Sequence, residues 1–549
     1  MLSILGFLIM LAPLVIVHEL GHFLFAKLFN VKAEAFSIGF GPRVWRRQIG
    51  ETEWRVSLIP LGGYVKLLGE DPEAPLKPEE KNRALQYQAR WKRFFIFFGG
   101  PLFNFLWAIL VYMTIIAVGE PTMSSFIGRV VPDSPAAVAG FVSSDVIHAV
   151  NGAPVTKFDE VTAAIDQNPE KEMTFAIERH DVVTGAASNL VVKATPHKTD
   201  GFSVYGEQTH VGEIDGLLPT ARAATVGISN LDLPVAKENG LRTGDTIVRF
   251  AGHEIATWED LERLYAALPP KSPISIEAKM KTANDKVSTF ALTKPAKATD
   301  LGHDFGIWSS ENFIEKTVEK SPAEEAGLRP GDRIVSIDGK EILHFFALKD
   351  AVQKGGEKDG KLEIVWEREG KRFERTVAPT ATVTRGPLLD KSTQYTIGVI
   401  PNIVWAEPKT IIERTLNPFT LVYKGTERML TFTYRNFVSI GKMFKGEVSV
   451  ATLGGPILIG KIAGDSLSRG LIAFLSTMGI LSIGLGVLNI LPVPVLDGGH
   501  ILLLIVEAIR GKPLSMRQLE AVQMFGLSII AALMLVVLKN DLTRLPFFN

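Results

Sequence analysis

The chain contains no cysteine among its 549 residues. Disulfides and thiolate metal sites are therefore excluded, so any bound metal ion must be held by His, Asp or Glu. A net charge is absent as well, because 59 basic residues are balanced by 59 acidic residues. This balance leaves no general positive field that would attract nucleic acid. We therefore expect neither cysteine chemistry nor a nucleic-acid partner.

Apolar residues, in contrast, are abundant, since 46% of the chain is hydrophobic. Such a composition in a chain of this length is typical of a membrane protein with several domains. Four segments are long and apolar enough to cross a bilayer, at 2–26, 94–118, 471–491 and 521–538. They place transmembrane helices within 1–29, 94–118, 471–500 and 519–538. The first segment lacks the basic start and the cleavage site of a signal peptide, so we expect it to be retained.

The distribution of charge predicts how these helices are oriented. The stretch 27–93 holds thirteen Lys or Arg residues against eight acidic ones. Short loops rich in Lys and Arg stay in the cytoplasm. We therefore interpret 30–93 as a cytoplasmic loop. Both termini and the long region between the second and third helices then lie outside the cytoplasm.

An H-E-x-x-H box lies inside the first apolar segment, running from His18 and Glu19 to His22. Positions four apart share one face of a helix, so both imidazoles can bind a single Zn²⁺ ion. Glu19 falls beside them, where a carboxylate can act as a general base. The alternative is a chance match, or two core histidines satisfied by hydrogen bonds. Ionisable groups are rarely placed at membrane depth without a function, which favours the metal site.

An internal repeat fills the region between the second and third helices. Each of its three copies has a short Pro-containing helix, a closing Gly, an Asp at a tight turn, a buried strand and an x-Gly hairpin. The closing glycines are Gly140, Gly240 and Gly327, which are 100 and 87 residues apart. The Asp and the final Gly recur at matching offsets in every copy. The pattern indicates three α+β domains of one kind.

These copies, at 124–200, 208–296 and 304–383, resemble bacterial PDZ domains. Domains of that kind bind peptides by adding a strand at a sheet edge. Three generic α+β domains with common turn chemistry are the alternative. No copy shows a clear carboxylate-binding loop, so the pattern supports the fold of these domains more strongly than peptide capture.

Beyond the repeats, residues 400–465 are amphipathic. Between 417 and 445, Phe and Leu side chains are mixed with Lys and Arg. This mixture suits a helix that lies on the membrane surface. A buried helix packed on the last repeat fits the pattern equally well.

A second candidate metal-binding element ends the third apolar segment, in N-I-L-P-V-P-V-L-D-G-G-H (489–500). Catalytic zinc sites use three protein ligands and keep a fourth position open. Two prolines break the helix here, and irregular backbone at membrane depth is tolerated only where it is buried or lines a cavity. In the expected topology Asp497 and His18 lie at the same depth, towards the cytoplasmic face. Asp497 is therefore a candidate third ligand, with plain helix capping as the alternative.

Together these motifs resemble the site-2 protease family, and closely its bacterial RseP branch of intramembrane zinc metalloproteases. The resemblance rests on H-E-L-G-H (18–22), F-S-I-G-F-G-P (36–42), L-I-P-L-G-G-Y-V-K (58–66), F-G-G-P-L-F-N (98–104), L-G-G-P (453–456) and the 489–500 segment. It implies that His18, His22 and Asp497 bind one zinc ion. It also implies that Glu19 is the catalytic base.

The same resemblance implies how a substrate would be held. Asn489, Pro492 and Pro494 would help to position the substrate strand. A membrane-associated β-hairpin at 52–66 would lie near the site, with a turn at Gly62 and Gly63. The family usually carries one or two PDZ domains, so the three copies found here depart from it.

The predicted fold class is a polytopic α-helical membrane protein with four transmembrane helices and an α+β insert of tandem PDZ-like domains. By resemblance, we expect proteolysis of single-span membrane proteins within the bacterial inner membrane, with the active site near the cytoplasmic face. The expected substrate is an anti-sigma factor in an envelope stress response, already trimmed by an upstream site-1-type protease. A zinc carrier is one alternative, although only four helices and no inverted repeat argue against it. A membrane-anchored peptide-binding scaffold with a vestigial zinc site is the other, although the intact box argues against it.

Overall fold

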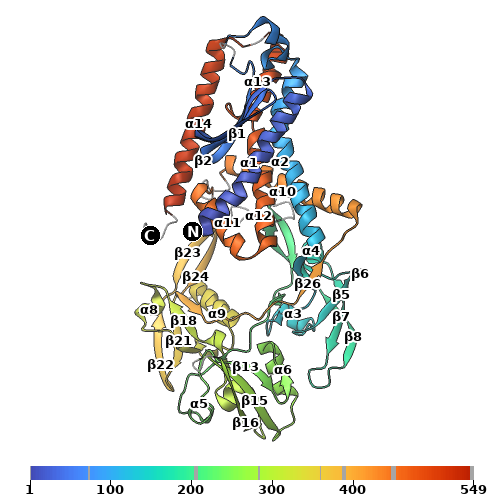
Figure 1. The fold of residues 1–549 in the computed structure, drawn as a ribbon. Coiled ribbons are helices and arrows are strands. Elements are labelled where there is room, and N and C mark those ends of the chain that lie inside the picture. Colours follow the sequence, from blue (N-terminus) through green and yellow to red (C-terminus); the bar gives the residue numbers. More distant parts are fainter. Residues whose placement is uncertain are drawn as a thin grey trace. The chain divides into compact units, whose positions relative to one another are not determined.

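Two units make up the chain, one helical and one rich in strands (Figure 1). Unit 1 combines Met1–Glu120 with Ile412–Asn549, and unit 2 is the intervening Pro121–Ile411. The computed structural model describes residues 2–71, 75–202, 208–281, 285–358, 360–385, 391–446, 453–512 and 514–543. Residues 447–452 of the predicted amphipathic region therefore lie outside the described residues.

Four helices of unit 1 are long and apolar enough to cross a membrane, as the sequence predicts. They are α1 (Leu2–Leu28), α2 (Arg90–Val118), α12 (Leu471–Ile490) and α14 (Met516–Thr543). The shorter or more polar helices described in unit 1 are η1 (Pro78–Arg83), η2 (Leu85–Tyr87), α10 (Pro418–Phe444), α11 (Pro456–Ser468) and α13 (Asp497–Arg510). These spans make the chain a membrane protein.

Helix α2 packs against both α1 and α12 at the centre of unit 1 (Figure 1). Leu14 of α1, Tyr112 of α2 and Met478 of α12 belong to one buried apolar cluster. At the closest point between α1 and α2 there is no room for a side chain, because a Cβ atom on Gly21 would lie 2.1 Å from the carbonyl oxygen of Gly99. Small residues allow membrane helices to approach in this way. The close contact brings the H-E-x-x-H box of α1 directly against α2.

A small sheet in unit 1 consists of β1 (Ala33–Ile49) and β2 (Thr52–Leu67). Both strands fold back, so each contributes two segments to the sheet. Segment 35–38 runs parallel to 53–56, whereas 43–49 with 52–57 and 33–38 with 63–67 are antiparallel. The segments lie in the order 43–49, 52–57, 33–38 and 63–67. The sheet therefore has two edges, 43–49 and 63–67.

The chain reverses near Gly62 and Gly63, as predicted, because 53–56 runs parallel to 35–38 whereas 63–67 runs antiparallel to it. The two arms do not pair with each other, since 33–38 lies between them, so 52–66 is not a hairpin of adjacent strands. Gly62 has a φ of 119° within β2. A Cβ atom there would lie 2.4 Å from the Phe40 ring. Glycine at this position thus permits the chain to turn beside an aromatic ring.

Helix α10 packs along α2 and α12 in unit 1. A Cβ atom on Gly425 of α10 would lie 3.0 Å from Cγ of Met113. The ring of Phe432 stacks on that of Tyr112, with 6.0 Å between centroids. Phe419, near the start of α10, is exposed. The alternative that this helix packs on the last repeat is therefore wrong, whereas its place on the membrane surface stays a prediction.

Each predicted repeat of unit 2 contains a four-stranded antiparallel sheet with the same strand order. The first is β6-β5-β7-β8, with β5 (Val146–Val150), β6 (Ala153–Pro154), β7 (Met173–His180) and β8 (Ala187–Ala194). The second is β14-β13-β15-β16, with β13 (Thr246–Phe250), β14 (His253–Glu254), β15 (Pro273–Met280) and β16 (Lys286–Thr293). The third is β20-β19-β21-β22, with β19 (Arg333–Ile337), β20 (Lys340–Glu341), β21 (Leu362–Arg368) and β22 (Lys371–Val377).

The helices of the three copies also correspond. A short helix precedes each sheet, namely α3 (Pro135–Val138), α5 (Pro234–Lys237) or α8 (Pro322–Glu325). A longer helix covers it, namely α4 (Phe158–Asp166), α6 (Trp258–Ala267) or α9 (Phe345–Lys358). Each copy has its own buried apolar cluster. The repeat in the sequence is thus a repeat of small α+β folds, and the predicted x-Gly hairpins are present, since both turn residues have positive φ in every copy.

A second recurring glycine escaped the sequence analysis. Gly216, Gly306 and Gly398 have φ values of 83°, 74° and 81°. Each of these glycines precedes a short strand, namely β11 (Leu217–Leu218), β17 (Trp308–Ser309) or β25 (Val399–Pro401). Strand β11 pairs with β4 (Arg129–Val130), β17 with β12 (Val226–Gly227), and β25 with β18 (Ile314–Thr317). A Cβ atom on Gly398 would lie 2.3 Å from that of Ser321. Each copy therefore has a tight glycine loop before a short strand, at a place where a side chain does not fit.

The remaining described elements of unit 2 are short. The strands form three two-stranded sheets, which pair β3 (Glu120–Met123) with β26 (Thr410–Glu413), β9 (His197–Phe202) with β10 (Gln208–Glu213), and β23 (Thr380–Arg385) with β24 (Lys391–Thr396). Two short helices, α7 (Leu301–Phe305) and η4 (Ser310–Asn312), flank β17.

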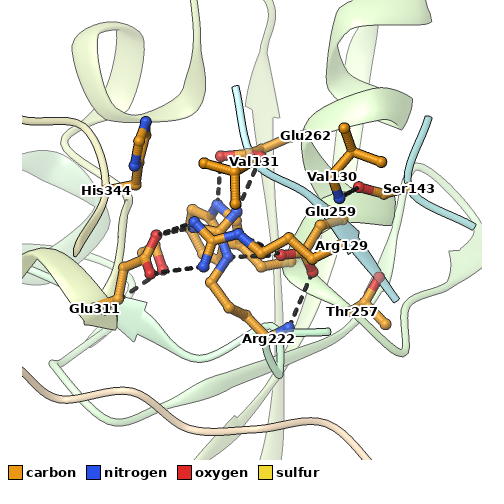
Figure 2. A network of polar contacts seen from close by, with 12 residues as sticks. Arg129, Val130, Val131, Ser143, Arg222, Thr257, Glu259, Glu262, Glu311 and His344 are labelled. Atoms are coloured by element: carbon orange, nitrogen blue, oxygen red, sulfur yellow. Dashed lines mark hydrogen bonds and ion pairs between the residues drawn. The ribbon is translucent and has the colours of Figure 1, made fainter. Parts of the chain in front are cut away.

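A buried cluster of charged side chains joins the three copies (Figure 2). Arg129 of the first copy donates two hydrogen bonds of 2.9 Å to Glu311 of η4, which lies between the second copy and the third. Arg222 of the second copy donates to the same Glu311 and, at 2.7 Å, to Glu259. These four side chains are at most 6% exposed. Because buried charges must be paired, this cluster of two positive and two negative groups fixes the copies against one another.

Candidate metal centre

Helix α1 carries the first half of the candidate metal site. His18 and His22 lie one helical turn apart, with their rings edge to face and 4.9 Å between centroids. Their Nε2 atoms are 3.3 Å apart. The i, i+4 spacing thus places both nitrogens on one face of the helix, as the sequence predicts.

Asp497 completes the group from the other end of the sequence. Helix α12 ends at Ile490, and α13 begins at Asp497 after a loop that contains two prolines. The Asp497 carboxylate lies 3.2 Å from Nε2 of His18 and 3.4 Å from Nε2 of His22. Leu496 occupies the N-cap position, and no side chain caps α13 there. The carboxylate therefore faces the histidines, and the helix-capping alternative is wrong.

Two glycines close the turn that presents this carboxylate. A Cβ atom on Gly498 would lie 2.2 Å from the carbonyl oxygen of Ile490, at the end of α12. One on Gly499 would lie 2.4 Å from the carbonyl oxygen of Val493. The D-G-G sequence therefore lets α13 start immediately beside the end of α12, which brings Asp497 back towards α1.

The donor set and its spacing fit a zinc ion. The ligand atoms of His18, His22 and Asp497 all lie within 4.8 Å of one another. Zinc binds imidazole nitrogen and carboxylate oxygen at about 2.0–2.2 Å, so two ligands of a tetrahedral site lie about 3.4 Å apart. The observed separations of 3.2, 3.3 and 3.4 Å match that spacing. Three protein ligands also leave the fourth position free, as catalytic sites require.

Residues of α2 that the sequence analysis did not single out lie against the site. The Ile96 carbonyl oxygen lies 2.8 Å from Nδ1 of His22. Nδ2 of Asn104 lies 3.0 Å from Nδ1 of His18. Both contacts leave the Nε2 atoms directed at Asp497. A polar Asn within an apolar span was the signal that could have identified Asn104, because polar groups at membrane depth are functional as a rule.

The sheet edge formed by 63–67, which pairs with no further strand in the described part of the chain, passes Glu19. A Cβ atom on Gly63 would lie 3.0 Å from Cγ of Glu19. The backbone of Val65 is a hydrogen-bond partner of the Glu19 carboxylate. Of the two glycines predicted to border the substrate, Gly63 therefore lies at the site, whereas Gly62 faces Phe40.

The other residues predicted to position the substrate lie shortly before Asp497 in the chain. Asn489 is in the last turn of α12, and Pro492 and Pro494 are in the loop before α13. Pro492 is exposed, and Pro494 packs on α14, where a Cβ atom on Gly526 would lie 2.4 Å from the proline Cβ. Their role in substrate positioning stays a prediction.

Among four membrane-spanning helices, the H-E-x-x-H box of α1 meets Asp497 at the start of α13, and this arrangement defines a membrane-embedded metallohydrolase. Peptidase family M50 matches this chain over residues 6–533, so the chain belongs to that family and is a zinc metalloprotease. The zinc carrier and the non-enzymatic scaffold, the two alternatives drawn from the sequence, are therefore wrong.

Several relatives that match almost the whole chain are named as regulators of sigma-E proteases. The regulator of sigma-E protease RseP of Salmonella typhimurium is 30% identical over 553 residues, which cover 99% of this chain and 100% of that protein. RseP of Escherichia coli is 28% identical over 542 residues, covering 98% of both chains. The regulator of sigma E protease of Haemophilus influenzae is 29% identical over 543 residues, again covering 98% of both.

Proposed function

We propose that this zinc metalloprotease cleaves single-span membrane proteins within the plasma membrane. His18, His22 and Asp497 hold one zinc ion, and Glu19 is the general base. The observation that carries the proposal is the meeting of the α1 histidines with Asp497 between apolar helices, at separations of 3.2–3.4 Å. When bound, the metal polarises a peptide carbonyl and lowers the pKa of water.

The chain's own residues supply the rest of the reaction. Glu19 follows His18 directly and lies beside the sheet edge, where it can take the proton of the attacking water. The same carboxyl group then gives that proton to the amine of the departing peptide. The N–H of Val65 holds the carboxylate in place for both transfers.

Segment 63–67 is the place where we expect the substrate to bind. A peptide bond inside a helix is shielded, so a membrane-spanning substrate must first become extended. A free strand edge can hold an extended peptide by main-chain hydrogen bonds, which demands little side-chain specificity. The 33–38 segment occupies only one edge of 63–67. The other edge runs past Glu19, at the correct place for such pairing.

We further propose that the three repeats, which we interpret as PDZ-like domains, stand outside the cytoplasm and exclude bulky ectodomains. The buried cluster around Glu311 supports this role, because a size filter must be rigid. The natural substrate would then be an anti-sigma factor that another protease has already trimmed. Full-length relatives named as regulators of sigma-E proteases support that assignment.

The test of the base is Glu19→Gln in purified protein reconstituted with a single-span substrate. We expect cleavage to fall by about 10²–10⁴-fold while zinc stays bound. Glu172→Gln, which alters an exposed pair with Lys193 in the first repeat, is the matched control and should cleave normally. Unchanged cleavage by Glu19→Gln would show that Glu19 is not the base.

The test of the filter uses two substrates with the same membrane span. One has an ectodomain of about twenty residues, and the other carries a folded domain in its place. We expect the trimmed substrate to be cleaved at least about tenfold faster. Equal rates would remove the filter from the proposal and leave the catalytic assignment intact.

A further inference from the structure

Asn104 is a fully buried polar residue in the middle of the second membrane span. Its side chain is 0% exposed, and its Nδ2 lies 3.0 Å from Nδ1 of His18. The backbone carbonyl oxygen of Asn104 accepts a hydrogen bond of 2.8 Å from the Ser482 hydroxyl of α12. Asn104 is thus held between α1 and α12, with its carboxamide against a proposed zinc ligand.

The chemistry of imidazole sets what this contact must provide. Nε2 of His18 faces Asp497 and His22, so it is the nitrogen that would bind the metal. A neutral imidazole carries one proton, which must then sit on Nδ1 and needs an acceptor. His22 meets this requirement, because its Nδ1 lies 2.8 Å from the Ile96 carbonyl oxygen. Metal-binding histidines are generally oriented by such a partner.

Next to His18, Asn104 can provide such an acceptor only through its side-chain oxygen, Oδ1. This oxygen is buried and, in its present orientation, has no hydrogen-bond partner among the described residues. A half-turn of the carboxamide about the Cβ–Cγ bond exchanges Oδ1 with Nδ2. The exchange would place the orphaned acceptor 3.0 Å from Nδ1, where the proton of the metal-binding tautomer has to be received.

We propose that Asn104 is a positioning residue for the zinc centre, whose Oδ1 accepts the Nδ1 proton of His18 and so fixes both the tautomer and the ring orientation. The inference rests on the proposed function, because it takes His18 as a zinc ligand. It goes beyond that function by assigning a role to a residue that touches neither substrate nor metal.

The test measures zinc affinity of the purified full-length protein by competition with a chromogenic chelator. Asn104→Leu keeps the size of the side chain but removes the acceptor, and we expect it to bind zinc about 10–100-fold more weakly. Asn104→Asp retains an oxygen at that position and should stay within about threefold of wild type. Thr114→Val, a polar-to-apolar change at an exposed site on the same helix, is the control and should bind zinc normally.

Two further measurements make the result decisive. Visible absorption of the cobalt-substituted proteins reports ligand geometry, and we expect only the variants without an acceptor to change it. Asn104→Ala provides a second loss of the acceptor if Asn104→Leu fails to fold. Wild-type zinc affinity in either of these variants, or an equal loss in Asn104→Asp, would overturn the role. His18→Ala distinguishes a failure of the zinc-ligand assignment from a failure of the role of Asn104. Unchanged zinc binding in His18→Ala would refute the assignment of His18 as a ligand.

Discussion

Gly100 of α2 lies so close to His22 of α1 that a Cβ atom on the glycine would be 2.4 Å from the histidine Nε2. The same atom would be 2.6 Å from Cε1 of His18. The glycine therefore creates the space in which both metal-binding nitrogens face Asp497. A single methyl group at this position would occupy the space next to the ligand atoms.

Gly100→Ala is therefore expected to damage the metal centre more than the fold. Overpacking of this kind costs about 1–3 kcal/mol, and the displaced histidines should weaken zinc binding at least about tenfold. Gly484→Ala is the matched control, because a Cβ atom on that α12 glycine meets nothing within 4 Å. Chelator competition on both variants checks the expectation, which wild-type zinc affinity in Gly100→Ala would contradict.

The number of bound zinc ions can be predicted from the geometry. We expect one ion per chain, lost in Asp497→Asn because that variant removes the charged ligand. A second group of His and carboxylate ligands, at His197, Glu213 and Asp215, is exposed and offers no buried cage. Removal of its histidine, His197→Ala, should leave the zinc content and the proteolytic activity unchanged. Elemental analysis of the purified variants measures the number of zinc ions per chain. A second ion that is lost only in His197→Ala would contradict the prediction of one ion per chain.

Val65→Pro tests the proposed substrate edge. Proline removes the N–H that contacts Glu19 and blocks further pairing at that edge. We expect cleavage of a single-span substrate to fall by at least about tenfold while zinc affinity stays within about threefold of wild type. Val65→Ala, which keeps the N–H, is the control. If the proline variant cleaves like wild type, main-chain pairing at 63–67 does not hold the substrate.

Glu311→Gln should weaken unit 2 in a pH-dependent way. Burial acts to raise the pKa of Glu311, but Arg222 and Arg129 outweigh burial and hold it below the ordinary value of 4.5. Ionised Glu311 thus stabilises the fold above pH 4.5, and this contribution is lost as the pH falls through the lower, folded-state pKa. At neutral pH the free energy of unfolding of the variant should be about 3 kcal/mol lower than that of wild type, because two buried guanidinium groups lose a charged partner.

The difference between wild type and Glu311→Gln should accordingly shrink as the pH is lowered from 7 to below 4.5. Tryptophan fluorescence during unfolding of the full chain in detergent measures it. Glu172→Gln breaks an exposed pair with Lys193 and should change stability by less than about 0.5 kcal/mol at any of these pH values. A constant difference across the pH range would mean that the charge of Glu311 does not stabilise the cluster.

Much of the architecture follows from local patterns in the sequence. Apolar runs of sufficient length identified the four long helices, and the i, i+4 spacing placed His18 and His22 on one helix face. The three copies in unit 2 were visible because each turn requires Gly or Asp at a fixed offset. These features depend on neighbours within a few residues, so the sequence alone could predict them.

Only the tertiary structure decided which distant groups meet. The approach of α2 to α1 at Gly21 and Gly99 brings Asn104 to His18, which lies 86 residues away. The reversal of β2 near Gly62 places segment 63–67 on the other side of 33–38, where it passes Glu19. The pairing of Arg129 with Glu311, 182 residues apart, joins the repeats. Such contacts depend on how closely backbones pack and which partner satisfies each buried polar group, and neither is encoded by the spacing of residues along the chain.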